Sequence, residues 1–280
     1  MADLCMRFPG GVYKAFTMSY DDGVEQDKKL ISIMEKYNLR GTFNLNSGVY
    51  AEEGHVYPEG QIHRRMSESE VSKVYKRDFI EVATHGYTHP FLDRIPAPLA
   101  VKEILDDKRA LEKQFDCIVR GHAYPFGTYS EDVEKILESE GILYARTVVS
   151  RRRFEIPEKW LELHPTCHHD DEKLFELADQ FITMDTNVGY PVMFYLWGHA
   201  YEFEANNNWD RIEKFAEKIS GHKDIWYATN IEIVTYQMAF KKLVFDVEMT
   251  KVYNPTATDI WFTYDGRPYF VKAGETIRIS

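Results

Sequence analysis

The chain has 280 residues, of which 44% are hydrophobic and 14% aromatic, and its formal net charge is −11. This length suits one large domain, or one domain with a small appendage, and the apolar content is enough for a substantial core. The negative charge argues against a nucleic-acid backbone or an anionic membrane as a partner.

The cysteines and the apolar segments indicate a reducing compartment. Cys5, Cys117 and Cys167 are far apart and odd in number, which fits neither a disulfide framework nor a CxxC metal site. We find no apolar run of about 18 residues and no signal-peptide core after Met1. We therefore expect a soluble, cytoplasmic protein. An enzyme that acts on polymers outside the cell would need an export signal.

The first half of the chain alternates strand-like and helical stretches. Apolar or alternating runs predict strands over 12–19, 41–47, 79–83, 117–127 and 142–149, the fourth of which ends in a rigid turn. Helical spacing between these runs predicts helices, one of which starts at Ser67 with a capping box. Residues 48–66 are polar, show no period, and are predicted to form a long loop.

The second half continues the alternation as far as about residue 240. Strands are predicted over 161–164, 191–197 and 225–228, and helices over a segment starting at Asp170 or Asp171, over 208–221 and over a segment ending at Phe240. About eight strands interleaved with about seven helices predict a parallel sheet. At this length, a (β/α) barrel is the economical form.

From about residue 242 the helical spacing stops. Residues 243–247 and 259–264 alternate in polarity, and Asp265-Gly266 is a hairpin signal. We therefore predict a barrel domain over 1–240 and a small antiparallel β appendage over 241–280.

Acidic and imidazole groups follow three of the predicted strands. Asp21 and Asp22 come after the first strand, His85 and His89 are four residues apart after another, and His199 follows the strand at 191–197. Taken alone, the aspartates are explained equally well by a turn and a helix cap, and the histidine pair by a surface accident. A parallel barrel, however, brings all these strand ends to one face.

Such a set of side chains can support hydrolysis. One carboxylate and two neutral histidines hold a divalent metal while leaving coordination positions open for water and substrate. The metal lowers the pKa of water and polarises a carbonyl. A second carboxylate is then free to act as a base, and a distant histidine can protonate the leaving group. This equipment suits amide or ester hydrolysis without a covalent intermediate.

Four short motifs also resemble those of a known family. The segments 20–23 (YDDG), 84–89 (THGYTH), 124–127 (YPFG) and 196–199 (LWGH) are similar, in order and rough spacing, to motifs of the NodB-homology polysaccharide deacetylases, carbohydrate esterase family four. The similarity extends over residues 15–200, and its first two motifs are the specific ones.

The resemblance implies a distorted (β/α) barrel of about seven or eight parallel strands with one divalent metal. The metal is usually zinc, with cobalt, nickel and manganese as alternatives, and its implied ligands are Asp22, His85 and His89. By the same resemblance, Asp21 is the general base and His199 the general acid. The backbone N–H near Phe126 is then a candidate for holding the oxyanion.

This sequence departs from the family pattern in two places. Ala123 stands where the third motif carries an arginine that holds the base, and Arg120 or, preferably, Arg146 is a candidate substitute. The acidic-tryptophan fourth motif is also absent, and residues 163–170 take its approximate place. Three interpretations of that segment stay open: a site rim with His168 or His169 on the substrate, a second metal cluster, or an exposed loop.

The predicted activity is removal of acetyl groups from N-acetylated or O-acetylated sugars. A hydrolase of small cyclic amides or imides and a catalytically lapsed sugar-binding barrel are the alternatives, so the expected ligand is an acetylated saccharide or a small amide. Tyr124 and Trp197 join Phe126, Arg146 and His168 as candidate substrate-binding residues. Whether the chain forms a homo-oligomer, and what the appendage does, stay open.

Overall fold

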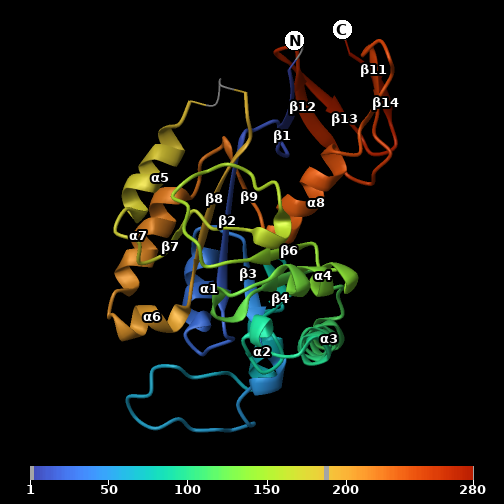
Figure 1. Ribbon diagram of the computed structural model, residues 1–280. Coiled ribbons are helices and arrows are strands. Elements are labelled where there is room, and N and C mark those ends of the chain that lie inside the picture. The colour runs from blue at the N-terminus through green and yellow to red at the C-terminus, as the bar shows by residue number, and fades with distance from the viewer. Residues whose placement is uncertain (1–2, 186–188, 280) are drawn as a thin grey trace.

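Figure 1 shows a computed structural model of the chain, which describes residues 3–185 and 189–279. In this described part, eight strands form one curved parallel sheet. They are β2 (Lys14–Asp21), β3 (Gly41–Leu45), β4 (Ile80–Thr84), β5 (Gly121–Ala123), β6 (Tyr144–Arg146), β7 (Cys167–His168), β8 (Val192–Gly198) and β9 (Ile225–Tyr227).

The sheet closes on itself without a regular strand at the seam. The strand order is β6-β5-β4-β3-β2-β8-β7, and β9 pairs with the first half of β2. The segment 163–169 spans the gap, because Leu163 N–H donates to the Ala145 carbonyl in β6 and Thr166 N–H donates to the Tyr195 carbonyl in β8. The predicted distorted barrel is therefore confirmed.

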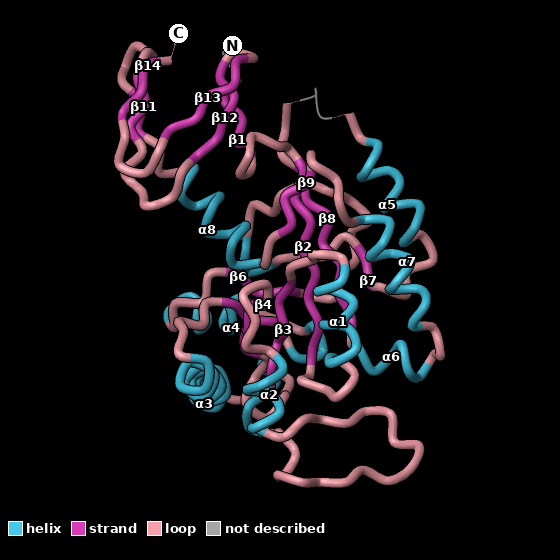
Figure 2. Tube along the Cα trace, turned by 180° about the vertical axis from the view of Figure 1, so that it is seen from behind, coloured by secondary structure: helices cyan, strands magenta, loops and turns pink. Residues whose placement is uncertain are grey.

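Helices surround this sheet (Figure 2). They are α1 (Asp27–Lys36), α2 (Glu68–Val74), α3 (Ala97–Phe115), α4 (Glu131–Ser139), α5 (Leu174–Thr183), α6 (Ala200–Ala205), α7 (Trp209–Ile219) and α8 (Asn230–Phe240). Local chemistry sets several of their ends. Ser67 and Glu70 form the predicted capping box of α2, and the Ser130 hydroxyl accepts the Val133 N–H at the start of α4.

Two elements differ from the sequence prediction. Residues 160–162 form a 3-10 turn instead of a strand, because Trp160 donates its indole N–H to Gln237 and the Leu161 carbonyl accepts the Tyr124 hydroxyl. These contacts to distant segments override the strand-like pattern. The helix α6 was not predicted, since six residues are too few to show a helical period.

The appendage is antiparallel, as predicted, but it includes a strand from the other end of the chain. β1 (Leu4–Arg7) pairs with β12 (Ile260–Tyr264), which forms a hairpin with β13 (Arg267–Val271). A second sheet contains β10 (Val244–Phe245), β11 (Lys251–Tyr253) and β14 (Thr276–Arg278). In both views the appendage lies at the opposite end of the barrel from the long loop after β3 (Figures 1 and 2). The division at residue 240 stays a prediction.

Burial explains why β2 is central. All eight residues of this strand are buried, with apolar clusters on both faces of the sheet. The three cysteines are free. Among the described helices, none combines the length and the apolar character that a membrane crossing requires.

Candidate active site

The carboxyl ends of the parallel strands bring the predicted chemical groups together. Asp21 ends β2, Arg146 ends β6, His85 follows β4 and His199 follows β8. A cavity of about 540 Å³ opens at this end. Its lining contains the predicted residues Asp21, Asp22, His85, His89, Tyr124, Phe126, Arg146, Trp197 and His199, together with His63, Arg65, Gly127, Val148 and Tyr201.

Asp22, His85 and His89 form a compact donor set, with their ligating atoms all within 4.8 Å of one another. The two Nε2 atoms of the histidines are 3.2 Å apart, and Asp22 Oδ1 lies 3.9 Å from His89 Nε2. His85 donates its Nδ1–H to the Ala123 carbonyl at 2.7 Å, which leaves the Nε2 lone pair facing the other two residues.

The charge states of these side chains fit a metal site. Burial lowers the pKa of His89 to about 4, and burial also lowers the pKa of His85, so both rings are neutral and can act as ligands at neutral pH. Burial alone would raise the pKa of Asp22, but the His63 hydrogen bond and the nearby positive groups lower it, so this carboxyl is ionised. One carboxylate and two neutral imidazoles are a donor set that suits zinc.

Asp21 lies beside this trio, and its carboxylate is in direct contact with a guanidinium group. The Asn44 amide donates to one of its oxygens at 2.7 Å, and the Arg146 guanidinium contacts the other. His85 Nε2 and His199 Nε2 are each 3.7 Å from that second oxygen. Although burial raises the pKa of Asp21, the charge of Arg146 outweighs it and keeps the pKa below its ordinary value.

Arg146, the preferred candidate to substitute for the arginine absent at position 123, contacts Asp21 from the end of β6. Its side chain is 1% exposed, and its guanidinium lies over the Trp197 ring at 4.4 Å. Arg120, the other candidate, precedes β5 and therefore lies at the opposite end of the strands.

His199 is placed between the aspartates and a glutamate on α6. Its Nε2 points toward Asp21, and its Nδ1 is 3.4 Å from Glu202 Oε2. Its backbone N–H donates to the same glutamate oxygen at 3.1 Å. Burial lowers the pKa of His199, but the ion pair with Glu202 and the charge of Asp21 outweigh burial and raise it above the ordinary value.

Two residues of the long loop reach the site, and the sequence did not reveal them. His63 Nε2 donates to Asp22 Oδ2 at 3.2 Å, and Arg65 contacts Asp22 Oδ1 at 3.1 Å. The loop has no periodic pattern, so nothing in its sequence indicated which of its side chains turns inward.

Of the remaining predicted substrate-binding residues, some line the cavity and one lies outside it. Phe126 is at the rim, stacked on Phe91 at 3.8 Å between ring centroids, and its ring is 4.5 Å from that of His89. Tyr124 lines the cavity, but its hydroxyl donates to the Leu161 carbonyl at 2.9 Å. His168 does not line the cavity, because its Nε2 faces Glu202 at 3.1 Å.

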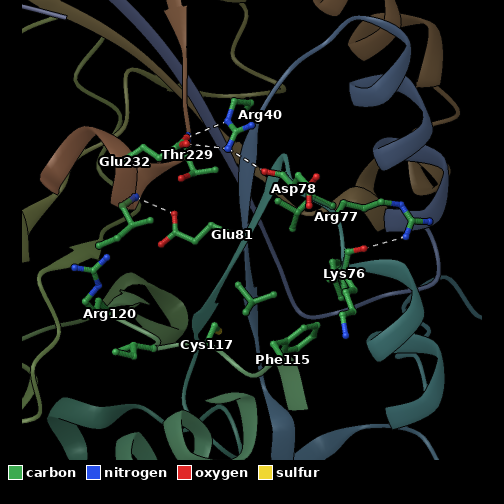
Figure 3. Close-up of a pocket in the computed structure, with 15 residues that line it drawn as sticks. Arg40, Lys76, Arg77, Asp78, Glu81, Phe115, Cys117, Arg120, Thr229 and Glu232 are labelled. Carbon is green, nitrogen blue, oxygen red and sulfur yellow. Dashed lines mark hydrogen bonds and ion pairs between the residues drawn. The ribbon is translucent and has the colours of Figure 1, made fainter. Parts of the chain in front are cut away.

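A second cavity, of about 360 Å³, lies at the amino ends of the strands (Figure 3). Arg40 on its wall is paired with Glu232 at 2.8 Å. Glu81 accepts the Ile231 N–H at 2.9 Å, and burial raises its pKa to about 7. No histidine is among the described residues that line this cavity.

Known proteins resemble this chain in sequence pattern and in fold. Residues 11–145 match the family model described as polysaccharide deacetylase. A Mycobacterium smegmatis structure assigned to the polysaccharide deacetylases superposes with a TM-score of 0.61 at 18% identity, covering 85% of this chain and 94% of the other. The peptidoglycan deacetylase PdaC from Bacillus subtilis, as a mutant, gives a TM-score of 0.50 at 16% identity, covering 82% and 95%.

One similarity is partial. The Streptococcus pyogenes deacetylase PplD, solved with acetate, is 21% identical over 47% of this chain, has a TM-score of 0.41, and is covered over 55% of its own length. A comparison with curated proteins finds no match. The family match over residues 11–145 and the likeness in fold make this chain similar to the polysaccharide deacetylases.

Proposed function

We propose that this protein is a metal-dependent hydrolase that removes acetyl groups from N-acetylated or O-acetylated sugars. One observation carries the proposal. A donor trio, an ionised aspartate and a histidine with a raised pKa share one cavity, with Asp21 3.7 Å from both His85 and His199. The Arg146 contact supports catalysis over the lapsed, binding-only alternative, because Asp21 keeps a cation partner although position 123 is alanine.

Each side chain has a distinct task in this scheme. A divalent metal on Asp22, His85 and His89, when bound, supplies Lewis acidity toward the acetyl carbonyl and the attacking water. Asp21 accepts the proton of the water, with Arg146 and Asn44 holding its carboxylate in place.

His199 completes the reaction from the other side. Glu202 and Asp21 raise its pKa above the ordinary value, which favours a ring that can give Nε2–H to the leaving amine or alkoxide. With Asp21 as the base and His199 as the acid, water can attack the acetyl carbonyl directly, without a covalent enzyme intermediate.

The cavity walls favour a sugar as the substrate. Trp197 and Tyr201 line the cavity from β8 and α6, and Phe126 faces it from the rim. Aromatic rings offer apolar faces against which the C–H face of a sugar can pack. The volume of about 540 Å³ lies within the range of small-molecule sites.

The test is acetate release from N-acetylglucosamine oligomers and acetylated xylo-oligomers by protein loaded with zinc, cobalt, nickel or manganese. We expect release that stops on chelation and is lost in Asp21→Asn, while His55→Gln, on the exposed part of the long loop, keeps it. Ring opening of hydantoins or imides without acetate release would favour the cyclic-amide alternative. Saccharide binding without release at every metal concentration would show a lapsed enzyme.

A further inference from the structure

The cavity of about 360 Å³ at the amino ends of the parallel strands is separate from the catalytic groups (Figure 3). We call it the amino-end cavity. Its wall is formed by the beginnings of β4 and α8, by the segment that follows α2, and by the segment from the end of α3 to β5. None of the described residues lines both this cavity and the catalytic cavity. A ligand in one of them therefore does not occupy the other.

Arg120 is a half-buried cation of this cavity without a partner. Its backbone is fixed directly before β5, because its carbonyl accepts the Leu143 N–H at 2.8 Å. Its Nε atom is buried without a hydrogen-bond partner, and its guanidinium makes no ion pair or hydrogen bond within the described part of the chain. A buried donor without an acceptor is unfavourable, and so is a charge that is shielded from water without a counter-charge. A ligand that brings an anionic acceptor would relieve both.

The two glutamates of the cavity wall already have partners of their own. Glu81 accepts the Tyr144 hydroxyl at 2.7 Å and the Ile231 N–H at 2.9 Å. Glu232 accepts two hydrogen bonds from Arg40, at 2.8 and 3.0 Å. Neither carboxylate is therefore directed at Arg120, whose guanidinium stays available to a ligand.

The balance of charge around the cavity favours an anion with a single charge. The lining cations are Arg40, Lys76, Arg77 and Arg120, and the lining carboxyls are Asp78, Glu81 and Glu232. Burial raises the pKa of Glu81 to about 7, so its negative charge is incomplete at neutral pH. The wall is thus slightly positive in a chain whose net charge is −11. Its carboxyls would still repel a dianion such as phosphate more strongly than a monoanion.

Apolar side chains cover much of the remaining wall. They are Tyr75, Ile80, Val82, Phe115, Ile118 and Ile231. Ile118 is 76% exposed, so a ligand that covers it removes apolar surface from water. The volume of about 360 Å³ lies within the range of small-molecule sites, in which apolar walls surround a few polar groups. The planar fork of a guanidinium matches the two oxygens of a carboxylate.

We propose that the amino-end cavity is a second binding site, which takes a monocarboxylate with an apolar body. The carboxylate pairs with Arg120, and the body packs against the apolar side chains of the wall. Medium-chain fatty acids have this chemistry. The inference is independent of the proposed function, because it involves none of the residues that carry out hydrolysis.

The experiment is a calorimetric titration of the zinc-loaded chain with octanoate, and with octanamide and octylamine as its neutral and cationic analogues. The variants are Arg120→Gln, which removes the charge, and Arg120→Lys, which keeps the charge without the planar fork. Arg77→Gln is the matched control. Arg77 lines the same cavity on the side opposite Arg120, and it donates to the Lys73 and Lys76 carbonyls (Figure 3).

We expect the wild type to bind octanoate about 10-fold or more tightly than octanamide, because hydrogen bonds between charged groups are the stronger ones. Arg120→Gln should abolish this difference, Arg120→Lys should keep part of it, and Arg77→Gln should keep nearly all of it. Equal affinities for octanoate and octanamide, or tighter binding of octylamine, would overturn the inference. The absence of saturable octanoate binding below about 1 mM would overturn it as well.

Cys117 reports where octanoate binds. It lines the amino-end cavity and is exposed, whereas Cys5 and Cys167 are buried. Octanoate should slow the alkylation of Cys117 by iodoacetamide in the wild type, and it should not do so in Arg120→Gln. A carboxylate can also bind a metal ion, so the titration is repeated after chelation. Octanoate binding that persists in Arg120→Gln and disappears on chelation would place the probe in the catalytic cavity and overturn the inference.

Discussion

Arg146 contacts Asp21 through its guanidinium, although 125 positions separate the two residues in the chain. Both are almost completely buried, at 1% and 2% side-chain exposure. The pair connects the ends of β2 and β6 across the cavity. A buried carboxylate needs such a partner, because an uncompensated charge in this environment is costly.

Replacing Arg146 by methionine should therefore damage both activity and stability. We expect kcat to fall by about 100-fold or more, as when one preorganised charge partner is lost. The free energy of unfolding should decrease by about 3–5 kcal/mol, because Asp21 remains buried without its cation. Arg146→Lys keeps the positive charge, so its kcat and its free energy of unfolding should both decrease less than those of Arg146→Met. Steady-state kinetics and denaturant unfolding measure these changes.

Arg120→Met is the control for this prediction. Arg120 lines the cavity at the other end of the strands, so its loss should leave kcat unchanged. If Arg120→Met were the inactive variant and Arg146→Met the active one, the assignment of Arg146 would be wrong.

His63 should influence metal affinity without being one of the trio. Its Nε2–H orients the Asp22 carboxylate at 3.2 Å, and partners of metal ligands typically contribute about 10–100-fold in affinity. We expect His63→Gln to weaken zinc binding by about 10-fold in calorimetric titration. His55→Gln, on the exposed part of the same loop, should bind zinc as the wild type does. Equal affinities in the two variants would contradict a role for His63.

Gly198 should be needed to make room for His169. A Cβ atom at this position would lie 2.0 Å from His169 Nδ1, and the backbone at Gly198 is outside the left-handed region, so the conflict is purely steric. We expect Gly198→Ala to lower the free energy of unfolding by about 1–3 kcal/mol.

A double-mutant cycle tests this cause. In a His169→Ala background the extra methyl has space, so Gly198→Ala should have little further effect on unfolding. If the two substitutions were additive in denaturant unfolding, the clash would not be the reason for the glycine.

Asp27 should make stability depend on pH. Burial raises its pKa to about 8, although the Tyr75 hydroxyl and the Val24 N–H donate to it. The ordinary value is about 3.9, so between pH 4 and 8 the folded state holds more of this proton than the unfolded state. Its contribution to stability is therefore full below about pH 4 and is lost as pH rises toward 8, with a slope of at most about 1.4 kcal/mol per pH unit.

Asp27→Asn should remove this contribution to the slope. Unfolding free energies at pH 5, 6, 7 and 8 are expected to show the variant gaining on the wild type as pH rises. Parallel curves for the two proteins would refute the assignment.

The sequence alone determined the barrel and much of the site, because both depend on local patterns. Apolar periodicity indicated the alternation of strands and helices, and parallel strands necessarily bring their carboxyl ends together. The positions of Asp21, His85 and His199 directly at or after strand ends were therefore enough to predict one shared cavity. The hairpin at Asp265-Gly266 was also predictable, since both residues adopt positive φ there.

The tertiary structure decided which distant side chains support those groups. Arg146 contacts Asp21 because Arg146 is the last residue of β6, whereas Arg120 precedes β5 and lies at the amino end of the strands. The amino-acid composition does not show at which end of a strand an arginine lies. His63 and Glu202 reach the site from a loop without periodicity and from a helix of six residues, so no repeating pattern indicated them. Their contacts arise from packing between segments far apart in the chain, and only the folded arrangement specifies that packing.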